Sequence, residues 1–453
     1  MTQQRTTVLA VCVGLLAGCT VPVKGGFSDV QKLVGERMEY RLHWYQGTPE
    51  DAEVAAQVRA MLAEELTLSS AVKIALLNNR DLQAIYEELG VAQADLVQAG
   101  LLSNPVFFGQ VRTPDTGSGT NTEFGFALDF LDILLLPARK NLAGLEFEAA
   151  KQRVSAAVLD LVAEVRKAFY MLQGDLRTTA MLRTIADAAG AAYEFARRQR
   201  EAGNVNELEL NTEQGLYEET KLELVRADIQ VLADREQLTR LLGVWGVDTE
   251  WRIDKALPEV PAQEVQLAEI EALAIENRLD LAAHRKETEV LEQALETVMN
   301  WRWLGSAEVG VSTEREAGGG RVTGPELALG LPIFDQGQAQ IARLEALVRR
   351  SRQDSAALAI EIRSEVRDIR NRLLLSRNVA EHYRSVVIPL REEIVGLTQL
   401  HYNFMLVGVF HLLEAKREEI AAYRNYIEAV RDYWMARTDL ERAVGGRLID
   451  ANE

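Results

Sequence analysis

The chain has 453 residues, a formal net charge of −18 and 47% apolar residues, so it has ample material for a folded core and is not a disordered polymer. The acidic excess argues against a nucleic-acid-binding protein, because such proteins concentrate basic residues on one face. Only ten prolines occur, and long tracts are rich in Ala, Leu, Glu and Arg, which favours a largely helical fold.

The first twenty residues have the pattern of a secretory signal, with Arg5 followed by an apolar run over 8–17. The run is too short to cross a bilayer as a helix. Leu16-Ala17-Gly18-Cys19 is similar to a bacterial lipobox. We therefore expect residues 1–18 to be a lipoprotein signal peptide and Cys19 to be lipidated, palmitate being one such acyl chain. An ordinary cleaved signal with an incidental cysteine is the alternative.

Cysteine chemistry is confined to this start, because Cys12 and Cys19 are the only two cysteines. The rest of the chain can form neither a disulfide nor a thiolate metal site. Residues 19–66 give mixed signals, and we interpret them as an irregular segment that packs on the outside of a larger body. Within it, Thr48-Pro49 is typical of a helix start, with proline in the first turn.

A unit of helices and strands follows over residues 67–243. A half-length helix covers 68–102, and its stop at Asn104-Pro105 leads into a β-hairpin over 106–131 with a long polar loop. A long helix is expected over 138–202, then a turn at 201–205, then a half-length helix over 206–242 that ends before Gly243, the expected C′ residue.

The first long helix carries a coiled-coil seam, because its apolar residues follow an alternating four-three spacing. At 1.5 Å per residue, about 65 residues give a helix of roughly 100 Å. Only Asp175 and Thr179 interrupt the seam, whose members are Val154, Val158, Leu161, Val165, Ala168, Leu172, Leu182 and Ala186.

A linker over 244–265 precedes a second unit over 266–446, which has the same order of elements. We expect a half-length helix from 266 to 299, a hairpin over 306–331, a long helix over 338–403, a turn near Gly408 and a half-length helix over 409–444; residues 447–453 form a tail. In the second long helix the four-three spacing includes Leu390 and Leu397, and Pro389 predicts a bend.

The two units are predicted to be repeats of one another. Leu327, Leu329 and Leu331 alternate with small residues at the two-residue period of a strand. About 201 positions earlier, Phe126, Leu128 and Phe130 have the same alternation, and each series precedes a long helix.

The four strands have the length and alternation of transmembrane β-strands, although a soluble sheet covered on one face is the alternative. Trp301 and Trp303 favour the membrane, since Trp collects at bilayer interfaces. Four strands cannot close a barrel, and open edges in lipid leave backbone groups unpaired, so other copies must complete it. Two copies supply eight strands, and three supply twelve with room for an aqueous lumen.

The order of elements, together with Leu329-Gly-Leu-Pro-Ile-Phe-Asp335, Ala75-Leu-Leu-Asn-Asn79 and Leu412-Leu-Glu-Ala415, resembles the TolC-like outer membrane factor family, in particular its lipoprotein members. The resemblance covers Leu66 to Gly446. It implies a mainly α fold with a small β part: a homotrimer whose long antiparallel coiled-coil helices form an α-barrel across the periplasm, above a 12-stranded β-barrel in the outer membrane lipid of a Gram-negative bacterium.

Such a protein is the passive exit duct of a tripartite efflux pump or a type I secretion system. It docks to a periplasmic adaptor protein and an inner-membrane transporter. The family's periplasmic tip is formed by the two helix turns, and the second turn commonly carries acids that constrict the closed pore. Here the matching positions are His411 and Glu414, so one acid is replaced; solvated helix residues are the plain alternative.

The stretch Phe404 to Phe410 is too apolar for a free turn. We therefore expect the two turns to contact the adaptor and Val407→Asp to abolish transport. The contact residues are Gly203, Asn204, Val205, Leu406, Val407 and Gly408.

No enzyme is expected from this sequence. Its five histidines are scattered, and it contains neither a GxxxxGK nor an HExxH motif. We therefore expect no catalytic residues, no metal site and no cofactor. A periplasmic coiled-coil adaptor is the first competing function, but it needs one helical hairpin between β-rich domains. The second is a structural lipoprotein of an envelope complex, and a purely soluble scaffold needs neither Cys19 nor the alternating strands. The cargo is not identified by the sequence.

Overall fold

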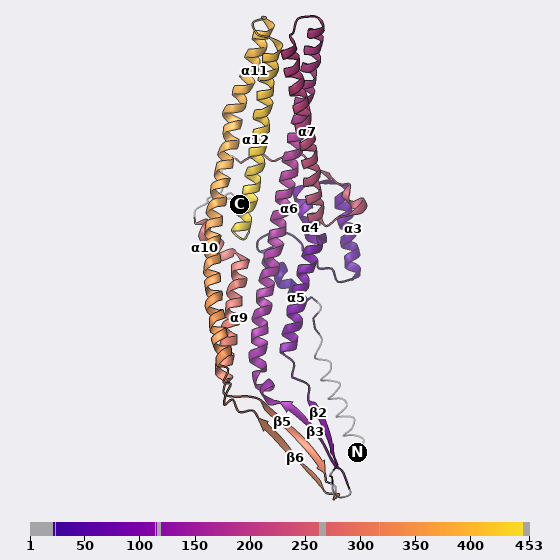
Figure 1. Ribbon diagram of the computed structural model, residues 1–453, viewed down its shortest axis with the longest axis vertical. Helices are drawn as coiled ribbons and strands as arrows, with labels where there is room; N and C mark the ends of the chain where they lie inside the picture. The colour runs from indigo at the N-terminus through magenta and orange to yellow at the C-terminus, as the bar shows by residue number, and fades with distance from the viewer. Residues whose placement is uncertain are drawn as a thin grey trace. The chain divides into compact units, whose positions relative to one another are not determined.

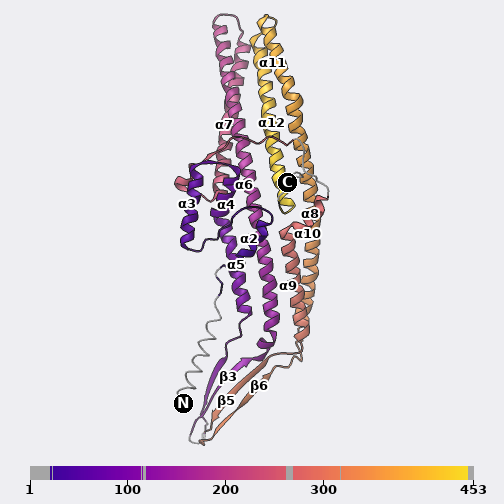
Figure 2. The same ribbon diagram turned by 180° about the vertical axis from the view of Figure 1, so that it is seen from behind.

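A computed structural model describes residues 21–22, 24–113, 115, 119–261, 269–316 and 318–446. The chain is mainly helical with a small sheet (Figures 1 and 2). It divides into two compact units: unit 1 comprises the described residues of 1–30, 86–154 and 279–359, and unit 2 those of 31–85, 155–278 and 360–446. The predicted signal peptide, Cys19 and the tail over 447–453 lie outside the described residues, as does 262–268, the end of the linker and the start of the next helix.

Unit 1 contains a four-stranded antiparallel sheet in the order β2-β3-β5-β6. The strands are β2 (Val106–Arg112), β3 (Asn121–Asp129), β5 (Ala307–Arg315) and β6 (Arg321–Leu329). The central pairing of β3 with β5 joins the two predicted hairpins and sets Phe126 opposite Val311. Pro325 lies in β6, at the edge of the sheet, where a residue without an N–H is tolerated.

The first long helix, α6 (Phe130–Glu201), begins earlier than the predicted residue 138. The carboxylate of Asp129 accepts hydrogen bonds from the backbone N–H groups of Leu131 and Asp132, at 2.9 and 3.4 Å. Asp129 therefore caps the helix and ends the strand, so the prediction that the strand continues to residue 131 was wrong. The predicted seam is confirmed as buried from Val158 to Ala186.

The second long helix is interrupted, because α10 (Gln338–His382) and α11 (Ile388–Asn403) flank a π-helical turn, Tyr383–Val387. Pro389 lies in the first turn of α11. Proline cannot donate to the carbonyl four residues before it, and a turn with i→i+5 bonds accommodates that loss. The apolar residues with predicted four-three spacing are buried in α10, namely Ile362, Val366, Ile369, Leu373 and Ala380. In α11, however, Leu390 and Leu397 are 53% and 52% exposed, contrary to the prediction.

Each predicted half-length helix before the strands is broken in two. α4 (Leu68–Asn78) and α5 (Arg80–Ala99) meet at Asn79, and α8 (Ile270–Asn277) and α9 (Leu279–Trp301) meet at Arg278. The Asn79 side chain accepts from the N–H of Leu82 and donates to the carbonyl of Leu241, and Asn78 donates to that of Leu242. The asparagine pair therefore starts α5 and secures the end of α7 (Glu207–Leu242).

Residues 27–66 are more regular than predicted. They contain α2 (Phe27–Gly35), α3 (Pro49–Ala63) and β1 (Glu65–Leu66), which pairs in parallel with β4 (Arg252–Ile253). The predicted start of α3 is confirmed, since Pro49 is its first residue and the carboxylate of Asp51 accepts from the N–H of Thr48 at 2.8 Å. A short 3-10 helix, η1 (Gly246–Thr249), lies between α7 and β4.

Gly243 ends α7 in the left-handed region, with φ 68°, as the sequence predicts for a C′ residue. A Cβ at this position meets the carbonyl oxygen of Asn78 at 2.6 Å. Gly445, with φ 77°, ends α12 (Val409–Ala443) in the same way, and its Cβ position lies 2.8 Å from Asn277.

Replacing Gly243 by alanine is therefore expected to lower the thermal midpoint and the free energy of unfolding by more than about 1 kcal/mol, from backbone strain and the contact together. Gly215 is the matched control: it lies inside α7, and its Cβ position meets nothing within 4 Å. Gly215→Ala is expected to raise stability by up to about 1 kcal/mol. This account is contradicted if the thermal midpoints of the two variants shift in the same direction.

Candidate functional site

One face of the four-stranded sheet is apolar and exposed. The pairing register places Phe107, Phe126 and Val311 side by side across three strands. The ring centroids of Phe107 and Phe126 are 5.1 Å apart. Eight large apolar side chains on this face are between 44% and 65% exposed. They are Phe107, Val111, Phe124, Phe126, Val309, Val311, Leu327 and Leu329.

The opposite face of the sheet is mainly polar or lined by small residues, with Val106, Phe108 and Val322 as its large apolar side chains. Glu123, Glu308 and Glu326 point to this side, as do Gly125 and Gly310, because they occupy the intervening positions of the register. Arg112 and Glu123 form an ion pair at 2.7 Å on neighbouring strands. A sheet with one dry and one wet face is suited to a boundary between lipid and water.

The edges of this sheet are β2 and β6, and within the described residues neither has a second neighbouring strand. An unpaired edge presents a row of backbone donors and acceptors that another strand can bind. The sheet is therefore a surface that can be extended on both sides.

The first helix turn, between α6 and α7, is closed by Gly203. Its φ is 78°, its N–H donates to the carbonyl of Arg200 at 3.0 Å, and that of Asn204 donates to Gln199 at 2.9 Å. This pair of bonds is a Schellman motif. Asn206 then caps α7 by accepting from the N–H of Glu209.

The second turn, between α11 and α12, is closed by Met405 in place of a glycine. Met405 has φ 59°, its N–H donates to Tyr402 and that of Leu406 donates to His401, each at 2.9 Å. Gly408 is extended and takes the N-cap position. Met405, Leu406 and Phe404 are 93%, 70% and 69% exposed, whereas Val407 is half-buried. An apolar turn of this kind is a candidate contact surface.

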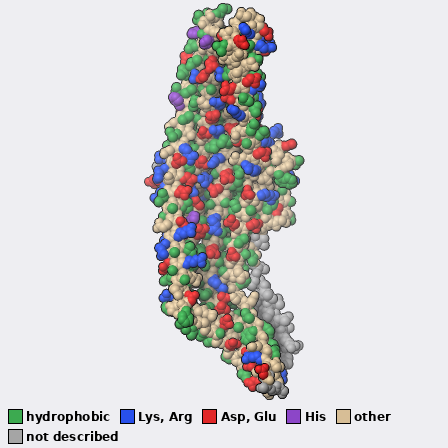
Figure 3. Space-filling model, in the orientation of Figure 1, with side chains coloured by type: hydrophobic (Ala, Val, Ile, Leu, Met, Phe, Trp, Pro, Cys, Tyr) green, Lys and Arg blue, Asp and Glu red, His purple; other side chains and the backbone are tan. Residues whose placement is uncertain are grey.

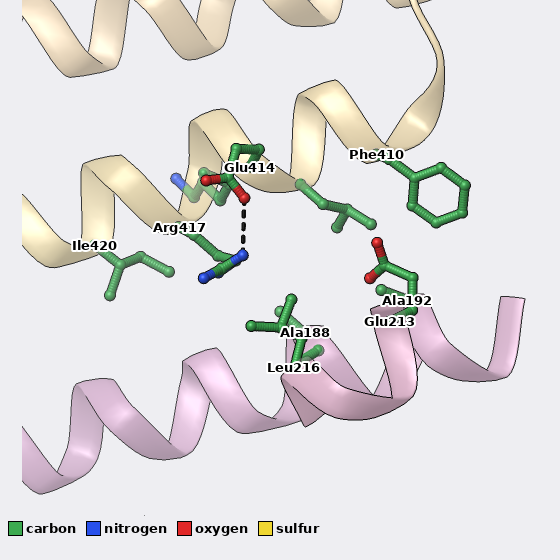
Figure 4. A pocket seen from close by; sticks show the side chains of 11 residues that line it. Ala188, Ala192, Glu213, Leu216, Phe410, Glu414, Arg417 and Ile420 are labelled. Atoms are coloured by element: carbon green, nitrogen blue, oxygen red, sulfur yellow. Dashed lines mark hydrogen bonds and ion pairs between the residues drawn. The ribbon is translucent and has the colours of Figure 1, made fainter. Parts of the chain in front are cut away.

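The two turns lie at the same end of unit 2 (Figures 1 and 2). Near that end the rings of Phe195 on α6 and Phe410 on α12 make an edge contact, with centroids 6.4 Å apart. A small pocket lies beside this contact, lined by α6, α7 and α12 (Figure 4). The structure thus brings α6, α7 and α12 together close to the two turns.

Glu414 lines this pocket and forms an ion pair with Arg417 at 2.7 Å, one helical turn away (Figure 4). Glu213 of α7 lines the same pocket. Burial raises the pKa of Glu213, the charge of Arg417 opposes that rise and the charge of Glu414 adds to it. The charged residues that line the pocket are therefore two acids, Glu213 and Glu414, and two bases, Lys416 and Arg417.

His411 is exposed one turn before Glu414 on α12 and is not among the residues that line the pocket. The two predicted constriction residues are three positions apart on one helix face, but only Glu414 has a partner from the pocket. Glu213 and Arg417 were not predicted from the sequence, and neither was the left-handed backbone of Met405 within the predicted apolar stretch. Arg417 could have been found as a charge three residues after Glu414.

Two further apolar stripes are exposed on the helices of unit 2. The first, the α7 stripe, consists of Leu222, Val225, Ile229 and Leu232, which are 54–62% exposed. The second, the α10/α11 stripe, consists of Leu375, Val379, Val386, Leu390 and Leu397, which are 45–63% exposed. Their spacings of three, four and seven residues place each set on one helix face. Elsewhere on the visible face of the helices, acidic and basic side chains are intermixed (Figure 3).

In the part of the chain that the structure describes, no group of three or more His, Cys, Asp or Glu side chains is arranged to hold a metal ion. No helix among the described residues has an apolar stretch long enough to cross a membrane.

Residues 71–244 match the model of the outer membrane efflux protein family. The cobalt-zinc-cadmium resistance protein CzcC of Cupriavidus metallidurans is 25% identical over 395 residues, which cover 84% of this chain and 91% of CzcC. The predicted relationship to the outer membrane efflux proteins is confirmed.

Solved structures share the fold. A membrane protein from Pseudomonas aeruginosa aligns with a TM-score of 0.70 at 21% identity, over 83% of this chain and 92% of that protein. The outer membrane protein VceC of Vibrio cholerae aligns with a TM-score of 0.67 at 16% identity, over 84% of this chain and 96% of VceC. The mainly helical architecture with a small sheet is therefore that of the outer membrane channel structures.

Proposed function

This chain is a relative of the outer membrane efflux proteins, and on that premise we propose that it forms the outer membrane exit duct of a tripartite efflux pump or a type I secretion system. The duct conducts passively and has no catalytic residues. It receives cargo from a periplasmic adaptor protein and an inner-membrane transporter. The observation that carries the proposal is the sheet of unit 1, which exposes an apolar face and, among the described residues, has no neighbouring strand at either edge.

Three copies complete the membrane-spanning part. An apolar face that is 44–65% exposed in one chain is satisfied by lipid, and free edges are satisfied when β6 of one copy pairs with β2 of the next. Three sheets of four strands give a 12-stranded barrel with the polar face inside, wide enough for an aqueous lumen.

The helices also close into a ring, because each copy packs head to tail on the next copy, as the strands do. One chain carries two different apolar stripes, on α7 and on α10/α11, and a heterologous contact between unlike surfaces generates a ring when the rotation between copies closes. The α7 stripe of one copy therefore packs on the α10/α11 stripe of the next. Each copy contributes two proposed repeats, 67–243 and 266–446, joined by the linker over 244–265.

The start of the chain adds a lipid anchor to the outer membrane. Its basis is the lipobox Leu16-Ala17-Gly18-Cys19, from which residues 1–18 are removed as a signal peptide. The mature protein then begins at Cys19, and the periplasmic segment over 19–66 follows.

The two helix turns form the periplasmic tip, and their exposed backbone and apolar side chains contact the adaptor. The first turn contributes Gly203, Asn204 and Val205, and the second contributes Leu406, Val407 and Gly408. Support comes from the exposure of Leu406, which is 70%. Inside the tip, Glu414 and His411 constrict the lumen, where one ring of three Glu414 carboxylates attracts cations.

Glu414→Gln is expected to reduce the cation preference of the channel, because it removes three carboxylates and leaves Arg417 without the ion-pair partner that it has in the described chain. The measurement is the reversal potential of single channels in a planar bilayer under a salt gradient. Glu414→Asp, which keeps the charge, is the control and is expected to behave like the wild type. An unchanged reversal potential in Glu414→Gln contradicts the constriction assignment.

The competing functions fit these surfaces less well. A periplasmic coiled-coil adaptor does not require a sheet with an exposed apolar face and two edges open to further pairing. A structural lipoprotein of an envelope complex does not require one either. The deciding experiment extracts the native protein from membranes. A detergent-dependent trimer that conducts ions in a bilayer supports the proposal, whereas a single chain that stays in solution without detergent contradicts it.

A further inference from the structure

An acidic pair, in which Asp234 is buried and Asp175 is partly exposed, joins three helices of unit 2 away from the turns. Asp175 of α6, Asp234 of α7 and Arg431 of α12 meet there, and we call these three residues the acidic joint. Asp175 is one of the two polar residues that interrupt the predicted coiled-coil seam. Nothing in the proposed duct uses it.

Asp234 is almost fully enclosed. The residue is 5% exposed, and its Oδ1 accepts a hydrogen bond from the amide of Gln230 at 2.9 Å. Its Oδ2 is buried and, among the described residues, has no donor. A buried carboxylate oxygen without a donor has lost its hydration without replacement, so this oxygen requires a proton or a partner.

The nearest candidate partner is another acid. The carboxyl group of Asp175 is the acid that acts on Asp234, and it raises the pKa of Asp234 both through a side-chain hydrogen bond and through its charge. Asp175 Oδ1 accepts from Nη1 of Arg431 at 3.1 Å. Two carboxylates cannot bond one another, so the contact is satisfied only when Asp234 is protonated and donates to Asp175.

The acidic joint contains two carboxyl groups but only one cation, so Arg431 cannot neutralise both carboxylates. Arg431 is the cation that faces the pair from α12, and it also bonds the exposed Asp432 and lies near Glu428. Gln230, on α7 itself, is neutral. The close approach of Arg431 depends on Gly174, where a Cβ lies 2.8 Å from the arginine Cδ.

Burial raises the pKa of Asp234 to about 7, and the hydrogen bond and charge of Asp175 contribute to that rise against Gln230 and Arg431. A raised pKa in a carboxyl group means that the folded arrangement binds the proton more tightly than the open one. The proton therefore stabilises the closed arrangement fully only below the ordinary pKa of 3.8, and this stabilisation is lost as the pH rises through about 7.

We propose that the acidic joint is a proton-operated contact: a proton shared by Asp234 and Asp175 holds α7 against α6 and α12, and its release loosens α7. The proposal rests on the described helices alone, so it stands or falls independently of the exit-duct function. It gives the helical wall a response to the pH of its compartment, at a place distinct from the turns.

The test is amide hydrogen exchange in α7, on the intact detergent-purified protein at pH 6 and pH 8, corrected for the intrinsic effect of pH on exchange. With a pKa near 7 in the closed state, protection around Asp234 is expected to fall about tenfold over these two units. Asp234→Asn keeps the donor to Asp175 without a titrating proton and is expected to abolish that pH dependence. Asp228→Asn is the control, because Asp228 is on the same helix in an exposed pair with Arg183.

Infrared spectroscopy gives a second readout. The wild type is expected to show a protonated carboxylic acid band that disappears between pH 6 and 8, and the band should be absent from Asp234→Asn and also from Asp234→Ala. A band retained in both variants, or wild-type protection that does not change with pH, overturns the proposal. If Asp234→Asn does not fold, the wild-type band and its titration still decide the matter.

Discussion

Ile229→Asp is expected to prevent the copies from assembling. Ile229 lies in the middle of the α7 stripe and is 61% exposed in one chain. In the proposed ring it is covered by the α10/α11 stripe of the next copy, where an unpaired carboxylate costs several kcal/mol. A closed ring repeats that cost at each of three contacts. The expected result is that the trimer is replaced by single chains or aggregates.

Native mass spectrometry of the detergent-extracted protein measures this outcome. Ile229→Leu is the matched control, since it keeps an apolar side chain of the same size at the same site and is expected to form trimers. Circular dichroism checks that the Asp variant keeps its helices, as expected for a change at an exposed position. A fully trimeric Ile229→Asp variant shows that the α7 stripe is not the contact between copies.

Leu406→Asp is expected to abolish export while the trimer still forms. The second turn exposes Leu406 by 70%, so a carboxylate there is solvated in the free protein but is buried against the proposed adaptor contact. This position is a sharper test than Val407, which was predicted from the sequence but is half-buried and supports the turn. A charge at Val407 therefore disturbs the fold as well as the surface.

The first readout is copurification of the adaptor. The second is growth of the host in the presence of toxic compounds that kill a strain from which this protein has been deleted. Leu406→Met preserves the apolar surface and is expected to behave like the wild type. Unimpaired export by Leu406→Asp, with the variant present at normal levels in the outer membrane, removes the second turn from the adaptor contact.

Local patterns predicted those elements whose causes are local. The alternation of Phe126 and Leu128 identified β3, and the glycine at 243 identified the end of α7. The start of α6 was missed although its signal is present, because Asp129 fits the alternation of the strand as well as the cap of the helix. The two interpretations compete, and only the hydrogen bonds decide between them.

Other features depend on residues far apart in the sequence. The break at Asn79 exists because that side chain bonds the end of α7, 162 positions away. The pocket joins Glu213 to Glu414 through the packing of two hairpins, which no spacing reveals. The second turn was located correctly, but its left-handed residue is Met405, and only glycine is commonly expected to adopt that conformation.

The π-helical turn over Tyr383–Val387 explains a small discrepancy between the proposed repeats. Their strand residues are offset by 201 positions, as in Phe126 and Leu327, whereas Gly203 and Met405, and likewise Gly243 and Gly445, are offset by 202. A π-turn absorbs one inserted residue without rotating the helix beyond it. The second long helix thus tolerates a residue that the first lacks, and deleting one position within that turn should realign the two halves of the chain.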